Sequence, residues 1–139
     1  MLEYGIERYC DKLVEEIKPL LERHYQEVAL YKEHIPLAPD WVRYKKLADV
    51  DALCIVGARD NGLLVGYCVF YISSMMHYMT TMSANNDVIY LAPEYRNGFA
   101  GIRLIKTAEA ALKKLGITKV FWHIKFAKDF RKILYRMGY

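Results

Sequence analysis

The groups best suited to do chemistry gather in one stretch of the sequence, residues 87–105. It holds an aspartate, the short apolar run 88–91, a turn containing arginine and glycine, and then apolar residues at helical spacing. This pattern predicts a strand, a turn and a helix that begins inside the glycine-containing segment. The first amides of a helix lack partners within it, and with the helix dipole they favour an anion such as phosphate. The stretch therefore predicts an anion-binding turn.

The turn does not match two common phosphate-binding patterns. It has neither the Gly-x-Gly-x-x-Gly of dinucleotide-binding folds nor the Gly-Lys-Ser/Thr of P-loop proteins. It resembles motif A of the GNAT superfamily, the Gcn5-related N-acetyltransferases, which reads Arg/Gln-x-x-Gly-x-Gly/Ala and often follows Pro-Glu-Tyr-Arg. Arg96 matches the first position and Gly101 the last. Phe99 stands at the middle glycine position, and Gly98 comes one residue earlier.

The order of elements expected along the chain also resembles this family. A β-prone run at residues 118–124 and a helical stripe at residues 130–137 follow the motif-A helix, and a Gly-Tyr pair closes the sequence. Trp-His-Ile-Lys at residues 122–125 and Arg-Met-Gly-Tyr at residues 136–139 are similar to a phage-encoded branch of the superfamily. The resemblance is specific over residues 87–139 and looser before them.

The first half of the chain supplies the remaining elements. We expect a strand at residues 2–10, then a helix with an apolar stripe at residues 13–28 in which Pro19 makes a kink or a break. Asp40 is a candidate cap for a short helix that carries Trp41 and Tyr44. Two strand-like runs, residues 53–58 and 63–72, flank an Asn-Gly pair typical of a hairpin.

Together these patterns predict one domain over residues 1–139 with an α/β (α+β) fold, a GNAT-like mixed central sheet flanked by helices. GNAT domains usually carry two further strands after the Gly-aromatic pair, and this sequence stops at Tyr139. Either the sequence is truncated at this point, or the domain is a minimal version that lacks the last two strands. The fifth strand would then be a bare sheet edge, so we expect a displaced segment or another chain, as in a homo-oligomer, to cover it.

The composition is that of an ordinary globular protein, with 54% hydrophobic and 26% charged residues. The longest apolar stretch, residues 63–76, is interrupted by Gly66 and serines, and no signal-peptide pattern opens the chain. We expect a soluble, cytoplasmic protein without a membrane partner. The three cysteines lack metal-ligand spacing, so we expect reduced, packed thiols and no metal site.

Charge alone does not single out a partner. The formal net charge is +4, and basic residues are concentrated in residues 103–136. Such a field suits the phosphates of CoA, and it leaves nucleic acid open as a substrate. A solvated helix face would show the same excess of lysine and arginine.

The resemblance implies that acetyl-CoA is a cosubstrate whose acetyl group passes directly to an amine. In the family, the pantetheine arm inserts between the splayed fourth and fifth strands, and the pyrophosphate binds the amides of motif A. Carried onto this sequence, the pantetheine contacts are Ile89, Tyr90 and Leu91. The pyrophosphate contacts are Arg96, Asn97, Gly98, Phe99, Ala100, Gly101 and Ile102.

An amine must lose its proton before it attacks, so the reaction needs a base. Asp87 is the first candidate, because many relatives place an acidic base near the start of the fourth strand; otherwise it finishes a turn. His123 on the fifth strand is the second, the alternative being a half-buried, hydrogen-bonded histidine. His77 and Tyr78, in the loop before the fourth strand, are candidate substrate contacts or simply exposed loop residues.

The acid that protonates the leaving thiolate is less well marked. The family often uses a tyrosine four residues before the glycine of the Gly-aromatic pair, where this sequence has Leu134. Its neighbour Tyr135 is the candidate, although one helical step turns it about 100° away. The acceptor amine has no readable signature. Two other functions stay open, namely a phage enzyme of the same fold that modifies DNA or nucleotides, and a non-catalytic homologue that binds CoA or a protein.

Overall fold

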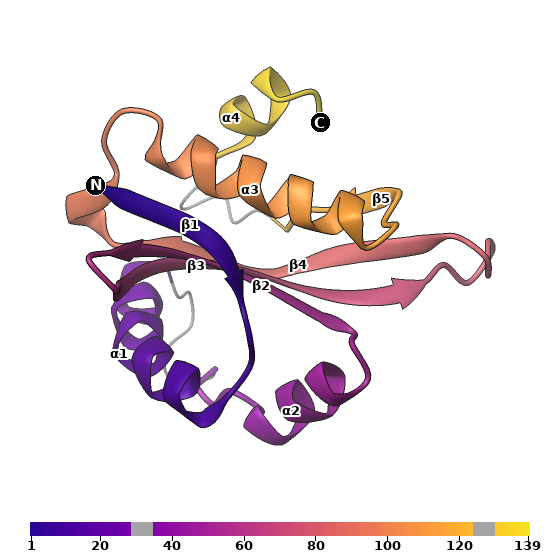
Figure 1. Ribbon diagram of the computed structural model, residues 1–139, viewed down its shortest axis with the longest axis horizontal. Helices are drawn as coiled ribbons and strands as arrows, with labels where there is room; N and C mark the ends of the chain where they lie inside the picture. Colours follow the sequence, from indigo (N-terminus) through magenta and orange to yellow (C-terminus); the bar gives the residue numbers. More distant parts are fainter. Residues whose placement is uncertain (29–34, 124–129) are drawn as a thin grey trace.

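A five-stranded sheet separates two layers of helices in the computed structural model, which describes residues 1–28, 35–123 and 130–139 (Figure 1). The strands are β1 (Leu2–Glu7), β2 (Leu53–Asp60), β3 (Leu63–Ser74), β4 (Met82–Leu91) and β5 (Lys119–Phe121). The helices are α1 (Asp11–Val28), α2 (Trp41–Asp49), α3 (Ala100–Lys114) and α4 (Arg131–Arg136), with a 3₁₀ turn η1 (Pro93–Tyr95) after β4. The predicted mixed sheet flanked by helices is confirmed.

The sheet follows chain order. Strands β1 to β4 pair antiparallel, and β5 joins the far edge of β4 in parallel. The β2–β3 hairpin turns at Asn61 and Gly62, whose φ angles of 48° and 85° are both positive. Two-residue hairpins with two positive φ angles favour Asn-Gly, so the predicted hairpin is confirmed for the reason that the sequence suggested.

Helices cover both faces of the sheet. In Figure 1, α1 and α2 lie below it, while α3 and α4 lie above it. Because both faces are covered, β2 and β3 are buried on both sides and read as near-continuous apolar runs. None of the helices in the described part of the chain is both long and apolar enough to cross a membrane. The α1 side of the core includes Leu13, Ile17, Leu20, Ile55, Tyr67 and Val69, and the α3 side includes Val56, Phe70, Leu104, Ala108 and Leu112.

Several element boundaries differ from the prediction: β1 ends at Glu7 and not at residue 10, while β2 continues to Asp60 and β3 to Ser74. Helix α1 runs unbroken through Pro19, which is exposed, so the predicted break is wrong. Strand β4 begins at Met82, so Asp87 lies well inside the strand and does not finish a turn. Strand β5 ends at Phe121, and the predicted end of this strand at residue 124 lies outside the described residues.

The two parallel strands diverge soon after they meet. Only Ser83, Ala84 and Asn85 of β4 pair with β5, opposite its three residues. Among the described residues, positions 87–91 of β4 therefore have no strand partner on the β5 side. Beyond Asn85 this edge of β4 therefore lacks strand pairing in the described part of the chain, which agrees with the expected splaying of the fourth and fifth strands.

Candidate functional site

A β-bulge in β4 sets the direction of Asp87. Val69 of β3 pairs with Val88, whereas the next residue of β3, Phe70, pairs with Asn86, so Asp87 is one extra residue in the strand. Such an extra residue interrupts the alternation of side chains between the two faces. Val88 packs in the core beneath α1, and the Asp87 carboxylate is bonded by a side chain from α2. Both residues therefore face the α1 and α2 side of the sheet.

Asn86 supports the bulge from inside the protein. Its side chain is buried, and its Nδ2 donates to the carbonyl oxygens of Val69 and Val88, each at 3.2 Å. These two oxygens belong to the strand pair that the bulge interrupts. The Asn86 amide therefore replaces part of the ladder hydrogen bonding that the extra residue removes.

We expect Asn86→Ala to lower the free energy of unfolding by about 2 kcal/mol, because it removes two buried hydrogen bonds of about 1 kcal/mol each. Urea denaturation measures the change. The control is Asn85→Ala, at a half-buried neighbour in the same strand, which should cost less than about 1 kcal/mol. Equal losses in the two variants would show that the Asn86 amide does not support the bulge.

The Asp87 carboxylate is exposed, and one of its oxygens has a partner. The Tyr44 hydroxyl, from α2, donates a hydrogen bond to Oδ2 of Asp87. Burial, and then the bond and charge of Asp87, raise the pKa of Tyr44, so Tyr44 keeps its proton at neutral pH. The site thus joins a carboxylate and a neutral phenol from elements that are distant in the sequence.

Arg96 braces the turn after β4. Its Nε donates to the carbonyl oxygen of Leu91 at 2.6 Å, and its guanidinium forms a paired contact with the carboxylate of Glu27 in α1, with Nη2 at 2.7 Å from Oε2. The same guanidinium lies 5.4 Å from the ring centroid of Tyr90. The side chain of Arg96 therefore fixes the turn against β4 and α1.

A second ion pair connects the same two parts of the chain. Arg23 of α1 donates to both carboxylate oxygens of Glu94 in η1, at 3.1 and 2.7 Å. The bond from Arg23 holds the pKa of Glu94 at about 2. A carboxylate with a lowered pKa stays charged as the pH falls through its ordinary value, so this pair is lost only near pH 2. A cavity of about 480 Å³ lies beside the pairs, lined by Glu22, Arg23, Gln26, Glu27, Tyr90 and Pro93.

The N-terminus of α3 carries the predicted anion-binding turn. The helix begins at Ala100, and Gly98 has φ 58°, a conformation that favours glycine. Phe99 is 68% exposed, so its side chain does not fill the turn. A Cβ atom on Gly101 would meet nothing within 4 Å. Among the described residues, the amides of Asn97, Gly98, Phe99, Gly101 and Ile102 donate to no backbone acceptor.

These amides and the open edge of β4 fit the parts of acetyl-CoA that the resemblance assigns to them. Unpaired amides at a helix N-terminus suit a pyrophosphate, because anions are favoured there. Residues Ile89 to Leu91, which have no β5 partner among the described residues, lie directly before the turn, where a pantetheine arm needs hydrogen-bonding partners; the Leu91 carbonyl is already bonded by Arg96. The described residues contain no group of three or more His, Cys, Asp or Glu side chains arranged to hold a metal ion.

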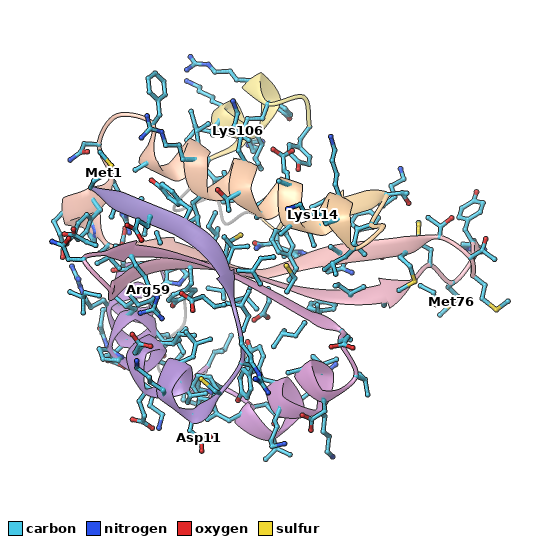
Figure 2. The ribbon with its side chains drawn as sticks, viewed as in Figure 1. Met1, Asp11, Arg59, Met76, Lys106 and Lys114 are labelled. Atoms are coloured by element: carbon cyan, nitrogen blue, oxygen red, sulfur yellow. The ribbon has the colours of Figure 1, made fainter. Side chains whose placement is uncertain are left out.

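The structure does not bring His77, Tyr78 or Tyr135 to Asp87. His77 and Tyr78 are exposed in the β3–β4 hairpin loop, whose tip is marked by Met76 in Figure 2. With strand spacing, β4 carries that loop about 30 Å from the turn after Leu91. His123 is exposed just after β5. Tyr135 is 68% exposed on α4, on the opposite side of the sheet from α2.

The sequence of this chain matches a known protein family. It matches the acetyltransferase (GNAT) family over residues 14–139. The chain belongs to that family. No curated protein is similar enough in sequence to count as a match.

Solved structures show the same GNAT fold. A ribosomal-protein-alanine N-acetyltransferase from Brucella melitensis biovar Abortus 2308 has a TM-score of 0.71 at 20% identity, covering 99% of this chain and 90% of that one. A predicted acetyltransferase from Clostridium acetobutylicum, solved with acetyl-CoA, has a TM-score of 0.76 at 12% identity, with 100% and 90% covered. An aminoglycoside acetyltransferase from an uncultured soil metagenomic sample has a TM-score of 0.75 at 16% identity, covering 98% of this chain and 86% of that one.

Proposed function

We propose that the protein is an acetyl-CoA-dependent N-acetyltransferase that passes the acetyl group directly to an amine. The observation that carries this proposal is that backbone groups lack described partners in two places, the edge of β4 beyond its pairing with β5 and the first turn of α3. Membership of the GNAT family supports the same conclusion. The exposed carboxylate of Asp87 lies in the same strand, two residues before the open segment at Ile89.

Each part of the site has a role in this proposal. The unpaired amides at the start of α3 hold the pyrophosphate, namely those of Asn97, Gly98, Phe99, Gly101 and Ile102, and the backbone of residues 89–91 holds the pantetheine arm. Acetyl-CoA supplies the thioester: the amine nitrogen bonds to its carbonyl carbon, the carbon–sulfur bond breaks, and CoA leaves with the electron pair on sulfur. Asp87 accepts the proton of the amine directly or through one water.

Two other candidates have lesser parts in the proposal. Tyr135 is exposed, so we assign protonation of the CoA thiolate to water, with Tyr135 as the nearest match to the tyrosine of the family. His123 is the second candidate base. The phage-like branch, the cytoplasmic location and the homo-oligomer that would cover β5 stay predictions from the sequence.

Calorimetric titration with acetyl-CoA, followed by assay of acetyl transfer to a panel of amines, tests the proposal. We expect saturable binding of one acetyl-CoA per chain and turnover of at least one amine. Absence of binding would contradict the proposal. Binding without turnover of any amine would indicate the non-catalytic homologue, and DNA binding that weakens steeply with salt would indicate the DNA-modifying enzyme.

A further inference from the structure

Helix α2 contributes little to the core, although it lies against the candidate site. None of its residues is buried, and Val42 is 67% exposed. Two phenol hydroxyls hold the helix in place. Tyr9 donates to the carbonyl oxygen of Trp41 at 3.2 Å, and Tyr44 donates to Asp87. A helix with so little buried surface, anchored on the candidate base, is better placed to contact a ligand than to stabilise the fold.

The bond from Tyr44 leaves half of the Asp87 carboxylate available. It occupies Oδ2, and among the described residues no side chain donates to Oδ1. Because the bulge turns Asp87 toward α2, the open oxygen lies on the side of the sheet opposite α3. An acceptor that reaches Asp87 from the α2 side would therefore not compete with a ligand at the first turn of α3.

Tyr44, which bonds this carboxylate, lies beside a second aromatic side chain of α2. The rings of Trp41 and Tyr44 lie 5.7 Å apart between centroids, and both are half-buried against the α1 side of the core. Tyr67 belongs to the same core cluster and is 1% exposed, and in the described part of the chain its hydroxyl has no hydrogen-bond partner. Burial first, and then the neighbouring ionisable groups Tyr90, Tyr44 and Asp87, raise the pKa of Tyr67, so it remains neutral. Asp87 is thus bonded by a neutral phenol, and the charge of Arg43, which also acts on Tyr44, is on an exposed side chain.

A carboxylate bonded by a neutral phenol complements one positive charge. An ammonium group can bond the open oxygen, and its alkyl chain can pack on the rings, which also attract cations. The geometry points to an acceptor that is a primary aliphatic amine, bound as its ammonium ion at Asp87, with an uncharged body packed against Trp41 and Tyr44. Tyr44 is then a positioning residue that fixes Asp87. This inference rests on the proposed function.

The choice of acceptor tests the inference. We compare acetyl transfer to pentylamine, aniline and norleucine at neutral pH, with saturating acetyl-CoA. Pentylamine is cationic, aniline is uncharged, and norleucine carries a carboxylate that Asp87 repels. We expect kcat/KM for pentylamine to exceed the other two by about tenfold or more, since one charged hydrogen bond accounts for that factor. Equal or better transfer to aniline or norleucine would overturn the inference and leave the proposed function intact.

A matched pair of variants tests Tyr44. Both Tyr44→Phe and Tyr9→Phe remove one phenol bond that anchors α2, but only the first releases Asp87. We expect Tyr44→Phe to lower kcat for pentylamine about tenfold, with unchanged affinity for acetyl-CoA, and Tyr9→Phe to stay within about twofold of the wild type. Equal losses would mean that Tyr44 only anchors α2, which would overturn its positioning role. Failure of acetyl-CoA to bind the wild type would instead reject the proposed function.

Discussion

Replacing Asp87 by asparagine is expected to lower kcat for amine acetylation by about 100-fold or more, with little change in the affinity for acetyl-CoA. A positioned general base contributes about 10²- to 10⁴-fold to such a reaction. Asparagine has nearly the same shape and can still accept the bond from Tyr44, so the bulge and α2 keep their places. Only the ability to take a proton from the amine is removed.

Steady-state kinetics and calorimetry on the same preparations separate the two effects. Asp49→Asn is the matched control, because Asp49 is an exposed aspartate of α2 whose only described ion pair is with Lys45. It should keep kcat within about twofold of the wild type, since surface substitutions usually have small effects. Equal turnover in Asp87→Asn and wild type would remove Asp87 from the role of base. Weaker acetyl-CoA binding would assign it a structural role in the strand.

Local patterns predicted much of the fold because each one reports a single element. The helical spacing of Ile105, Ala108 and Leu112 predicted α3, and all three are buried against the sheet. Asn61 and Gly62 predicted the hairpin, because the turn needs two positive φ angles. The anion-binding turn was also readable, since its amides come from consecutive residues.

Features that depend on pairing or packing with a distant part of the chain could not be predicted from the sequence. Residues 82–87 are largely polar, and they form a strand because β3 pairs with them, for example Ser73 with Ser83. The bulge at Asp87 depends on the register between β3 and β4, so the sequence of β4 alone does not predict it. In α1, burial of Leu13, Ile17 and Leu20 outweighs the hydrogen bond that Pro19 removes, so the helix continues.

The same distinction explains the site. Tyr44 and Asp87 are 43 residues apart, and Glu27 and Arg96 are 69 apart. Only the residue types hint at either pair. The spacing of apolar residues predicts a helix, but it does not predict which strand the polar residues of that helix will contact. Sequence reasoning therefore predicted a turn at the start of α3 and a candidate base in β4, and it missed Tyr44, which bonds that base, and Asn86, which supports the bulge.

The turn before α3 gives the second large effect. We expect Gly101→Leu to weaken acetyl-CoA binding by about 100-fold, because a bulky side chain would occupy the space in front of the helix amides. Losing two bonds from amides to a charged phosphate accounts for that factor. The fold itself should tolerate the change, because a Cβ at this position meets no atom within 4 Å. Replacing glycine within a helix also favours the helix by about 0.5–1 kcal/mol.

Calorimetry with acetyl-CoA and thermal unfolding of the free protein, measured together, decide the outcome. Ala110→Leu is the control, since it adds similar bulk to an exposed position of the same helix away from the first turn. It should bind acetyl-CoA like the wild type. Reduced affinity in Gly101→Leu with an unchanged or higher melting temperature would place the ligand at the helix N-terminus. Among the residues that the structure describes, no atom fills the space that a Cβ at Gly101 would take, so a leucine there can lower the affinity only by blocking a ligand. Unchanged affinity would therefore show that acetyl-CoA does not bind at this turn, and the anion-binding role of the turn would be rejected.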